Sequence, residues 1–313
     1  MLFRSLVLTV GAAMIGNLVV NVTLAKWFVE IRGRAVAFSA MGVSFAGIVL
    51  TPVMTLIIDE WGWRSGWQVM AAGSITLILP IAMLMRRAPE DYGLHPDGKT
   101  DAQVAAGQAQ KAEKDFAISL TRRQALRTTS FYLLVLAFGL FLITISVMLL
   151  QTIPYMTDAG YSRATAALMI TVASIPAFLS KPIWGLLIDR LNARPLAAAG
   201  AAITGMSMLI IVFSVQMGSE FWVYGGFFLL GCGWGGMIPL QEVIWASFFG
   251  RRYLGAVRSA AMPFSFLISA CAPLAASYYY DTIGNYDGIF LAVAVSNLLS
   301  ALLLLLMPAP RQM

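Results

Sequence analysis

Two ionisable residues lie inside long apolar stretches of this sequence. Lys181 belongs to the stretch 164–188, and Glu242 belongs to the stretch 221–249. Each lies about seven residues from one end of its stretch, so in a helix rising about 1.5 Å per residue it would lie roughly 10 Å inside that end. Insertion scales assign ~2.5–3.5 kcal/mol to such a charge at the centre of a membrane helix, and charges in this position therefore indicate functional sites.

The two side chains suggest different chemistry. The ammonium group of Lys181 could bind an anion, and the small residues Ala177 and Gly185 on the same helical face would leave room for one. Glu242 could pair with Lys181 or carry a proton. The alternative for Lys181 is that its four-carbon stem carries the charge part of the way to the membrane interface, with no ligand involved.

The amino-acid composition indicates the class of protein to which these two residues belong. The chain has 313 residues, of which 59% are hydrophobic and only 12% are charged, and its mean hydropathy is +0.78. Soluble domains are roughly 45–50% apolar and about 25% charged. So little charge cannot coat the surface of a soluble protein of this size, and the sequence therefore predicts an integral membrane protein.

Nine stretches are long and apolar enough to span a bilayer as helices, which requires about 20 residues each. They are 5–27, 35–58, 66–85, 131–153, 164–188, 196–216, 221–249, 255–279 and 286–307. Barrel strands would have only about 10 residues of alternating polarity. The predicted fold class is all-α, a polytopic bundle of membrane helices.

A polar stretch at 87–130 divides these helices into two groups. Residues 1–86 carry three of the predicted spans, and residues 131–313 carry six. We therefore expect an N-terminal half, a central loop and a C-terminal half.

Positive charge is unevenly distributed across this topology. Seventeen of the 21 Lys and Arg residues fall on one side; only Arg4, Arg64 and Arg163 fall on the other, and Lys181 lies inside a helix. Cytoplasmic loops of membrane proteins collect Lys and Arg, so the central loop and the C-terminus are expected in the cytoplasm. The net charge of +6 then reflects topology, and no nucleic-acid partner is expected.

The sequence gives little support for a metal site, a cofactor or an enzyme. The single His95 has no partner at ligand spacing, and Cys232 and Cys271 lie in apolar stretches, so we expect no metal site and no cofactor. No nucleophile–base pair, carboxylate pair or phosphate-binding loop indicates an enzyme.

Short motifs occur in order along nearly the whole chain. They read KWF at 26–28 with RGRA at 32–35, GWR at 62–64, RAPEDYGLHPDG at 87–98, GLLIDRLNAR at 185–194, FGRRYLG at 249–255 and DTIGNY at 281–286. Together they resemble the major facilitator superfamily of transporters, and most closely its monocarboxylate-transporter-like branch.

This resemblance implies a particular architecture. It numbers the nine stretches as helices four to twelve of a twelve-helix fold, so 1–86 would be an incomplete half. The first three helices would be missing from a truncated chain or from one begun at an internal methionine. Asp189 would contact residues 32–38, where the helix dipole stabilises a carboxylate. Asn192 replaces a glycine of the motif, and we expect it to tolerate a left-handed backbone.

The resemblance also bears on Lys181. This residue occupies the place of an eighth-helix Arg that contacts the substrate carboxylate in the branch, and a Lys supplies the charge without the bidentate fork. Proton-linked members have an Asp where this chain has Ala177, which puts proton coupling by that route in doubt.

Further residues receive roles by the same resemblance. Asn17 and Asn21 lie on the fourth helix and would contact the substrate. Glu242 would pair with a cation in a cytoplasmic gate rather than with Lys181. The candidate gating cations are Arg190, Arg194 and Arg258.

Small residues mark two further helix faces. Helix 221–249 contains Gly233, Gly235, Gly236 and Pro239, which would let it bend or let neighbouring helices pack closely. On helix 35–58, Ala35, Ser39, Gly42 and Ala46 are expected to form a packing face.

The function implied is secondary transport of a small organic anion such as a monocarboxylate, by alternating access in a bacterial-type inner membrane. The expected partners are the substrate, the lipid bilayer and a possible coupling proton or ion. The alternatives are an exporter of an apolar or zwitterionic compound and a non-transporting membrane fragment.

Overall fold

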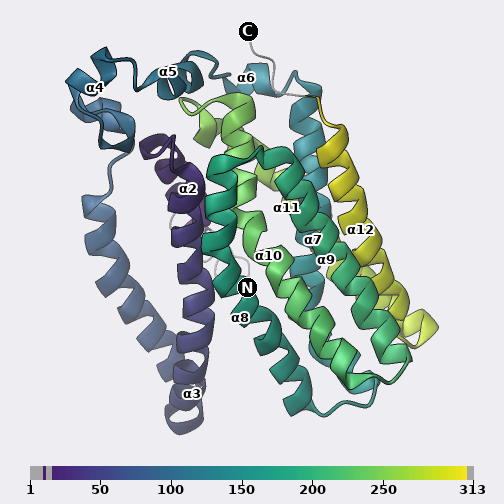
Figure 1. The fold of residues 1–313 in the computed structure, drawn as a ribbon. Helices are drawn as coiled ribbons and strands as arrows, with labels where there is room; N and C mark the ends of the chain where they lie inside the picture. Colours follow the sequence, from purple (N-terminus) through teal and green to yellow (C-terminus); the bar gives the residue numbers. More distant parts are fainter. Residues whose placement is uncertain (1–9, 12–15, 309–313) are drawn as a thin grey trace.

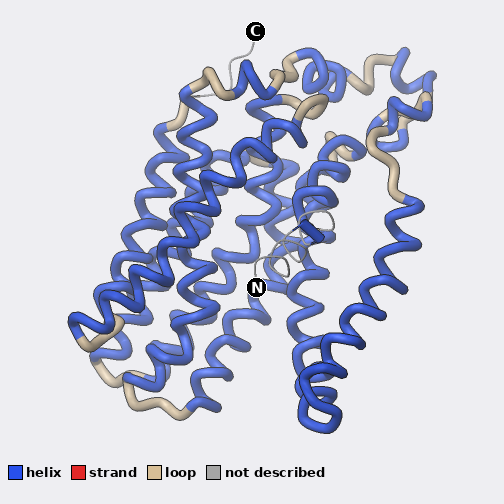
Figure 2. Tube along the Cα trace, turned by 180° about the vertical axis from the view of Figure 1, so that it is seen from behind, coloured by secondary structure: helices blue, strands red, loops and turns tan. Residues whose placement is uncertain are grey.

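The computed structural model describes residues 10–11 and 16–308, and every regular element within them is a helix (Figures 1 and 2). The principal helices are α2 (Asn17–Trp27), α3 (Arg32–Leu84), α7 (Thr129–Asp158), α8 (Arg163–Arg190), α9 (Ala193–Gln216), α10 (Glu220–Phe249), α11 (Leu254–Ile283) and α12 (Asp287–Leu306). The predicted all-α class is confirmed. Long apolar segments fold as helices because only helices satisfy their own backbone groups in lipid.

Helix α3 consists of two antiparallel helices. Gly62 interrupts it with a φ of 81° and a ψ of 164°, a combination that is essentially restricted to glycine. The chain reverses direction there and returns along the first part of α3 (Figures 1 and 2). The two parts correspond to the predicted spans 35–58 and 66–85.

Eight helical stretches among the described residues are long and apolar enough to cross a membrane. They match the second to ninth predicted spans. The first predicted span, 5–27, is represented by α2, and its earlier part lies largely outside the described residues.

The central loop folds into short helices that lie across one end of the bundle (Figure 1). They are the 3₁₀ helices η1 (Pro89–Tyr92) and η2 (Pro96–Gly98), followed by α4 (Asp101–Ala105), α5 (Gln110–Ala117) and α6 (Arg122–Ala125). Thr100 with Gln103 and Thr121 with Gln124 form capping boxes at the starts of α4 and α6, as expected for a Thr followed three residues later by Gln.

We call this end of the bundle the loop end, and the end where α3 reverses at Gly62 the opposite end.

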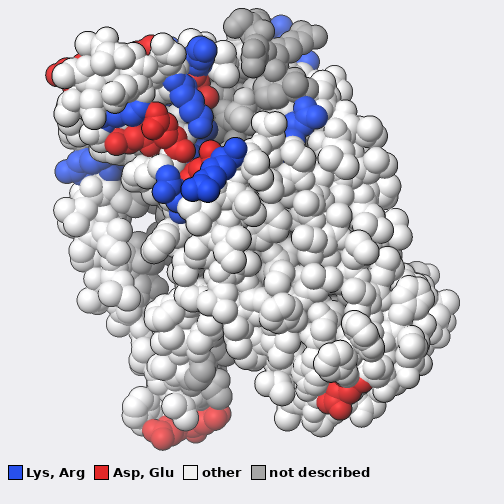
Figure 3. Space-filling view, viewed as in Figure 1, with Lys and Arg blue, Asp and Glu red and all other residues white. Residues whose placement is uncertain are grey.

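Charge follows the same division. In the face seen in Figure 3, Lys and Arg gather at the loop end together with acidic side chains, whereas the charged side chains at the opposite end are acidic and the surface between is uncharged. The uncharged band is typical of a surface that lies in lipid.

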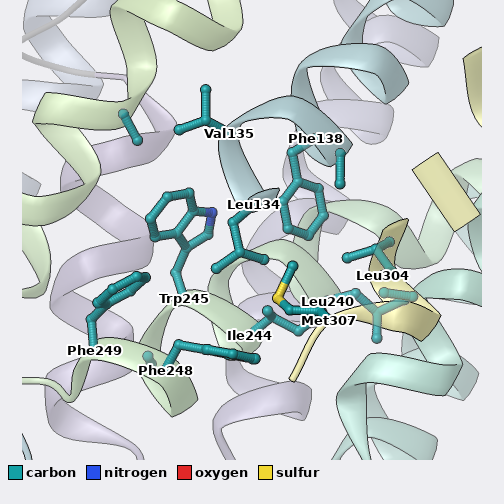
Figure 4. Packing of buried hydrophobic residues seen from close by; sticks show 14 of the residues in the cluster. Leu134, Val135, Phe138, Leu240, Ile244, Trp245, Phe248, Phe249, Leu304 and Met307 are labelled. Carbon is teal, nitrogen blue, oxygen red and sulfur yellow. The ribbon is translucent and has the colours of Figure 1, made fainter. Parts of the chain in front are cut away.

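The six helices α7 to α12 form a compact second half with two clusters of buried apolar side chains. Figure 4 shows the cluster nearer the loop end, in which Trp245 stacks on Phe249 with ring centroids 5.3 Å apart. Phe131 meets Trp245 edge to face at 5.6 Å. In the second cluster Tyr155 stacks on Phe290 at 4.1 Å. These clusters hold α8 and α10 in fixed positions beside α3.

Candidate functional site

The side chain of Lys181 bridges the two halves of the molecule. Its ammonium Nζ donates a hydrogen bond to the hydroxyl of Ser44 on α3 at 2.5 Å, and the residue is only 3% exposed. None of the ion pairs formed among the described residues includes Lys181. The site therefore contains a buried cation with one neutral partner, and burying a charge without a counter-ion is costly.

This geometry disfavours the alternative in which Lys181 extends to the membrane interface. Side chains on a helix lean toward its N-terminus, and α8 runs from the opposite end to the loop end (Figure 1). The stem of Lys181 is thus directed away from the nearer interface. The residue one turn earlier on the same face, Ala177, is also buried. Because it is an alanine, α8 supplies no carboxylate to Lys181 from that position.

Glu242 forms a buried ion pair with Arg258. Its two carboxylate oxygens accept hydrogen bonds from Arg258 Nη2 at 2.5 Å and Nε at 3.1 Å, and the two side chains are 4% and 6% exposed. The guanidinium also lies 5.2 Å from the ring centre of Trp245. Because α10 and α11 both belong to the second half, this bidentate pair fixes two helices of one half and does not cross between halves.

Asp189 contacts the start of α3, as the sequence analysis expected. Its carboxylate accepts hydrogen bonds from the backbone N–H of Gly33 at 2.7 Å and from the Nε of Arg34 at 2.8 Å. A longer bond of 3.4 Å comes from the backbone N–H of Arg34. The N-cap residue of α3, Ile31, has no capping side chain, so a carboxylate from the second half caps this helix of the first.

A pair of glycines makes this close approach possible. A Cβ added to Gly33 would lie 2.8 Å from the carbonyl oxygen of Gly185, and one added to Gly185 would lie 2.8 Å from the Cβ of Ala37. Residues of α3 spaced along this same face, Val36, Ala37 and Ala40, are buried.

The packing face of α3 is thus displaced from the predicted one. Gly42, one of the four small residues expected to pack, is exposed, and a Cβ added there would have no heavy atom within 4 Å. The face runs instead through Gly33, Ala37, Ala40 and Ser44, which are spaced at four, seven and eleven residues from the first. The predicted stripe has the same helical spacing two positions further along the chain, so the periodicity alone did not identify Ser44.

A cavity of about 760 Å³ opens beside the Asp189 contact at the loop end. Arg190 and Arg194 line it, together with Arg32, Lys111, Asp115 and Asp189. Arg194 donates a hydrogen bond of 3.4 Å to the carbonyl oxygen of Leu305. Neither Arg190 nor Arg194 pairs with Glu242, so of the three cations considered for Glu242 the structure selects Arg258.

Asn192 differs from its expected conformation. Its φ of −64° and ψ of 124° are extended, so the left-handed backbone expected at this position of the motif is absent. Asn192 instead directly precedes α9 as its N-cap residue, and its side chain makes no capping hydrogen bond.

The central loop contributes contacts that the sequence analysis did not identify. Asp97 accepts hydrogen bonds from the backbone N–H groups of Val29 and Glu30 at 3.1–3.3 Å. Asp115 pairs with the buried Arg32 at 2.7 Å, and Glu90 pairs with the buried Arg251. These residues are far apart in the sequence, and the pairing depends on how the loop folds back over the loop end.

The two asparagines on α2 have different surroundings. Asn21 is buried and Asn17 is exposed. Asn21 is therefore the one placed inside the molecule, and contact of either residue with a substrate stays a prediction.

The glycines of α10 are sites of close helix packing. A Cβ on Gly235 would lie 2.2 Å from the Ser180 hydroxyl on α8, and one on Gly233 would lie 2.7 Å from the Thr204 hydroxyl on α9. Gly236 packs against the indole of Trp184. Helix α10 continues unbroken through these glycines and Pro239, so packing accounts for the glycines, and a role in bending stays a prediction.

Comparison with known proteins identifies the family. The sequence model of the Major Facilitator Superfamily matches residues 1–156 and again residues 136–313. The chain belongs to this superfamily. Its relatives include Monocarboxylate transporter 4 of Gallus gallus, 24% identical over 291 residues, and Monocarboxylate transporter 12-B of Danio rerio, 21% identical over 294 residues. These are transporters rather than enzymes, in agreement with the sequence analysis.

The alignments cover most of this chain and only part of each relative. They span 91% and 89% of the chain, and 58% and 61% of the two relatives. The chain thus spans about three fifths of the length of the monocarboxylate transporters that it matches.

Solved structures show the same fold. The proton:xylose symporter XylE bound to 6-bromo-6-deoxy-D-glucose superimposes with a TM-score of 0.70 at 16% identity, over 92% of this chain and 67% of XylE. The transporter FucP in its outward conformation superimposes with a TM-score of 0.60 at 14% identity, over 90% of this chain and 70% of FucP.

Proposed function

We propose that this major facilitator protein is a secondary transporter of a small organic anion of the monocarboxylate class, which it moves by alternating access. The observation that carries the proposal is the buried ammonium of Lys181 at the contact between α3 and α8, with a hydroxyl as its one hydrogen-bond partner among the described residues. A substrate carboxylate would supply the missing counter-charge. The relatives named monocarboxylate transporters support this substrate class.

We further propose that the loop end faces the cytoplasm of a cell that holds the protein in its inner membrane. Lys and Arg gather at this end in the view of Figure 3, and cytoplasmic loops collect positive charge. In this orientation the bond of Asp189 to Gly33 and Arg34 closes the cytoplasmic side. Opening toward the cytoplasm would require this bond to break, and α3 and α8 diverge toward the opposite end (Figures 1 and 2).

The ion pair of Glu242 and Arg258 has a supporting part in this mechanism. It ties α10 to α11, so that the second half moves as one body when the halves rock against each other. Arg190 and Arg194 lie beside the Asp189 contact in the loop-end cavity and belong to the same gate.

The test compares two substitutions of Lys181, one that removes its charge and one that keeps it. Lys181→Met retains the stem and removes the ammonium, whereas Lys181→Arg retains a charge and offers a bidentate fork. The assay is uptake of radiolabelled lactate into proteoliposomes, by the 313-residue chain and by a chain extended by three helices at its N-terminus. Uptake should be abolished by the Met variant, because an unpaired buried carboxylate costs ~3–5 kcal/mol, and largely kept by the Arg variant.

A matched control is Lys114→Met, the same replacement at an exposed lysine of the central loop. It should transport lactate normally. Normal lactate uptake by Lys181→Met would refute the carboxylate role and favour export of an apolar or zwitterionic compound. Absence of uptake by both chains before any substitution would favour a non-transporting protein.

A further inference from the structure

Lys181 and Ser44 lie on opposite sides of the contact between the two halves. Ser44 belongs to the first part of α3, and Lys181 belongs to α8. Their side chains meet at 2.5 Å, four residues beyond the buried Ala40 on α3 and four residues before Gly185 on α8. Each half therefore contributes one polar group to this point, between faces of small apolar residues.

The hydrogen bond leaves donors unused on both groups. An ammonium has three N–H donors, and a hydroxyl has one donor and two acceptor positions. Lys181 uses one donor on the Ser44 oxygen, which then retains its own O–H for another acceptor. No other hydrogen bond connects either side chain to the described residues. Two adjacent donors, one charged and one neutral, are thus available to a single ligand.

Two adjacent donors fit the two oxygens of a carboxylate. Arginine binds carboxylates through two parallel N–H donors, and this bidentate geometry adds both energy and specificity. A lysine alone lacks that fork. The neighbouring faces carry Ala37, Ala40, Ala177 and Gly185, and these four residues add no second charge to the two donors.

We propose that Ser44 and Lys181 together form a two-donor clamp for the substrate carboxylate, with one donor from each half of the transporter. Ser44 supplies the second donor that the lysine lacks. The clamp exists only while α3 and α8 are in contact, so a bound carboxylate stabilises that contact. The proposal rests on the proposed function, because it places Ser44 in the same anion site as Lys181.

The test measures lactate binding to the 313-residue chain in lipid nanodiscs by titration calorimetry. Ser44→Ala removes the second donor and should weaken lactate binding about tenfold, which corresponds to ~1.4 kcal/mol. Ser44→Thr keeps a hydroxyl and should stay within about threefold of the unsubstituted chain. Ser39→Ala is the matched control, since it makes the same replacement on the same helix at a half-buried serine, and should not change the affinity.

Each remaining outcome decides between the two proposals. If Lys181→Met abolishes lactate binding while Ser44→Ala leaves it unchanged or strengthens it, the clamp is refuted and the anion site at Lys181 stands. An equal loss in Ser39→Ala, or no rescue by Ser44→Thr, also refutes the clamp, because the effect would then come from disturbance of α3. If neither the 313-residue chain nor the chain extended by three helices binds lactate, or if binding is independent of Lys181, the proposed function fails and the clamp fails with it.

Discussion

The contact of Asp189 with the start of α3 allows a quantitative prediction for the closing of the loop end. Asp189→Asn keeps the shape of the side chain and removes its charge. The ion pair with Arg34 is partly exposed, 9% for Asp189 and 49% for Arg34, and such pairs contribute ~0.2–1 kcal/mol. The interaction of the carboxylate with the dipole of α3 adds ~0.3–1 kcal/mol. Together they stabilise the closed contact by about 1.5 kcal/mol, so the variant should open roughly tenfold more often.

Asp189→Ala, which removes the whole carboxylate, should raise the open population more than Asp189→Asn does. Asp189→Ala also leaves the Gly33 N–H without its acceptor. Loss of that hydrogen bond adds about 1 kcal/mol and roughly a further fivefold in the open population. The two variants therefore form a graded series, in which the order of the effects is fixed by the number of interactions removed.

The open population can be followed by thiol labelling at the helix contact. Val36 is fully buried on the packing face of α3, and Val36→Cys places a thiol there in a background where Cys232 and Cys271 are replaced by Ser. When opening and closing are fast relative to the labelling, the rate of alkylation by a small maleimide follows the open fraction. The rate should rise about tenfold in Asp189→Asn and about fiftyfold in Asp189→Ala.

The control removes a carboxylate whose ion pair lies within the central loop and does not join the two halves. Asp91 pairs with Arg87 within the central loop, on exposed side chains four residues apart. Asp91→Asn should leave the labelling rate of the Val36→Cys chain unchanged. Equal rates in Asp189→Ala and the unsubstituted chain would refute the proposal that this carboxylate holds the loop end closed.

Three further predictions concern stability and topology. Glu242→Gln should lower the free energy of unfolding by ~3–5 kcal/mol, since it leaves the Arg258 charge buried without its partner. Thermal unfolding in detergent should show a smaller loss in the double variant Glu242→Gln, Arg258→Met. Equal losses in the single and double variants would contradict this coupling. Gly235→Ala should destabilise the chain because its Cβ would lie 2.2 Å from Ser180 Oγ, whereas Gly225→Ala, with its nearest atom at 3.9 Å, should not; equal melting temperatures would refute the packing argument. Cysteines at Lys111 and Arg190 should be labelled only from the cytoplasm and one at Gly160 only from outside, and labelling of all three from one side would refute the orientation.

The helices were predictable from the sequence because each depends on a local property. A run of about 20 apolar residues must hydrogen-bond within itself in a bilayer, and this argument needs no knowledge of neighbouring helices. The contact of Asp189 with residues 32–38 was anticipated through the family motif, and the structure contains it. The predicted spans and this one contact therefore required only local patterns and a resemblance.

Side-chain partners between helices were not predictable in the same way. Ser44 is one of several small polar residues on α3, and only the rotation of that helix about its axis decides which of them meets Lys181. The predicted packing face was wrong for the same reason, since a shift of two or three positions turns a different side of the helix to α8. The choice of Arg258 for Glu242 likewise depends on the register of α11 against α10, which no local pattern encodes.

The bonds of the central loop limit how the loop end can move. On one side, Asp97 holds the backbone at Val29 and Glu30, and Asp115 holds Arg32. On the other side, the backbone N–H of Leu120 donates to the carbonyl oxygen of Phe249 at 2.9 Å. The loop is therefore a strap fastened to both halves. Any motion that draws α3 away from α8 must either break one set of these bonds or stay within the range that the loop allows. The loop therefore limits how far the proposed gate can open.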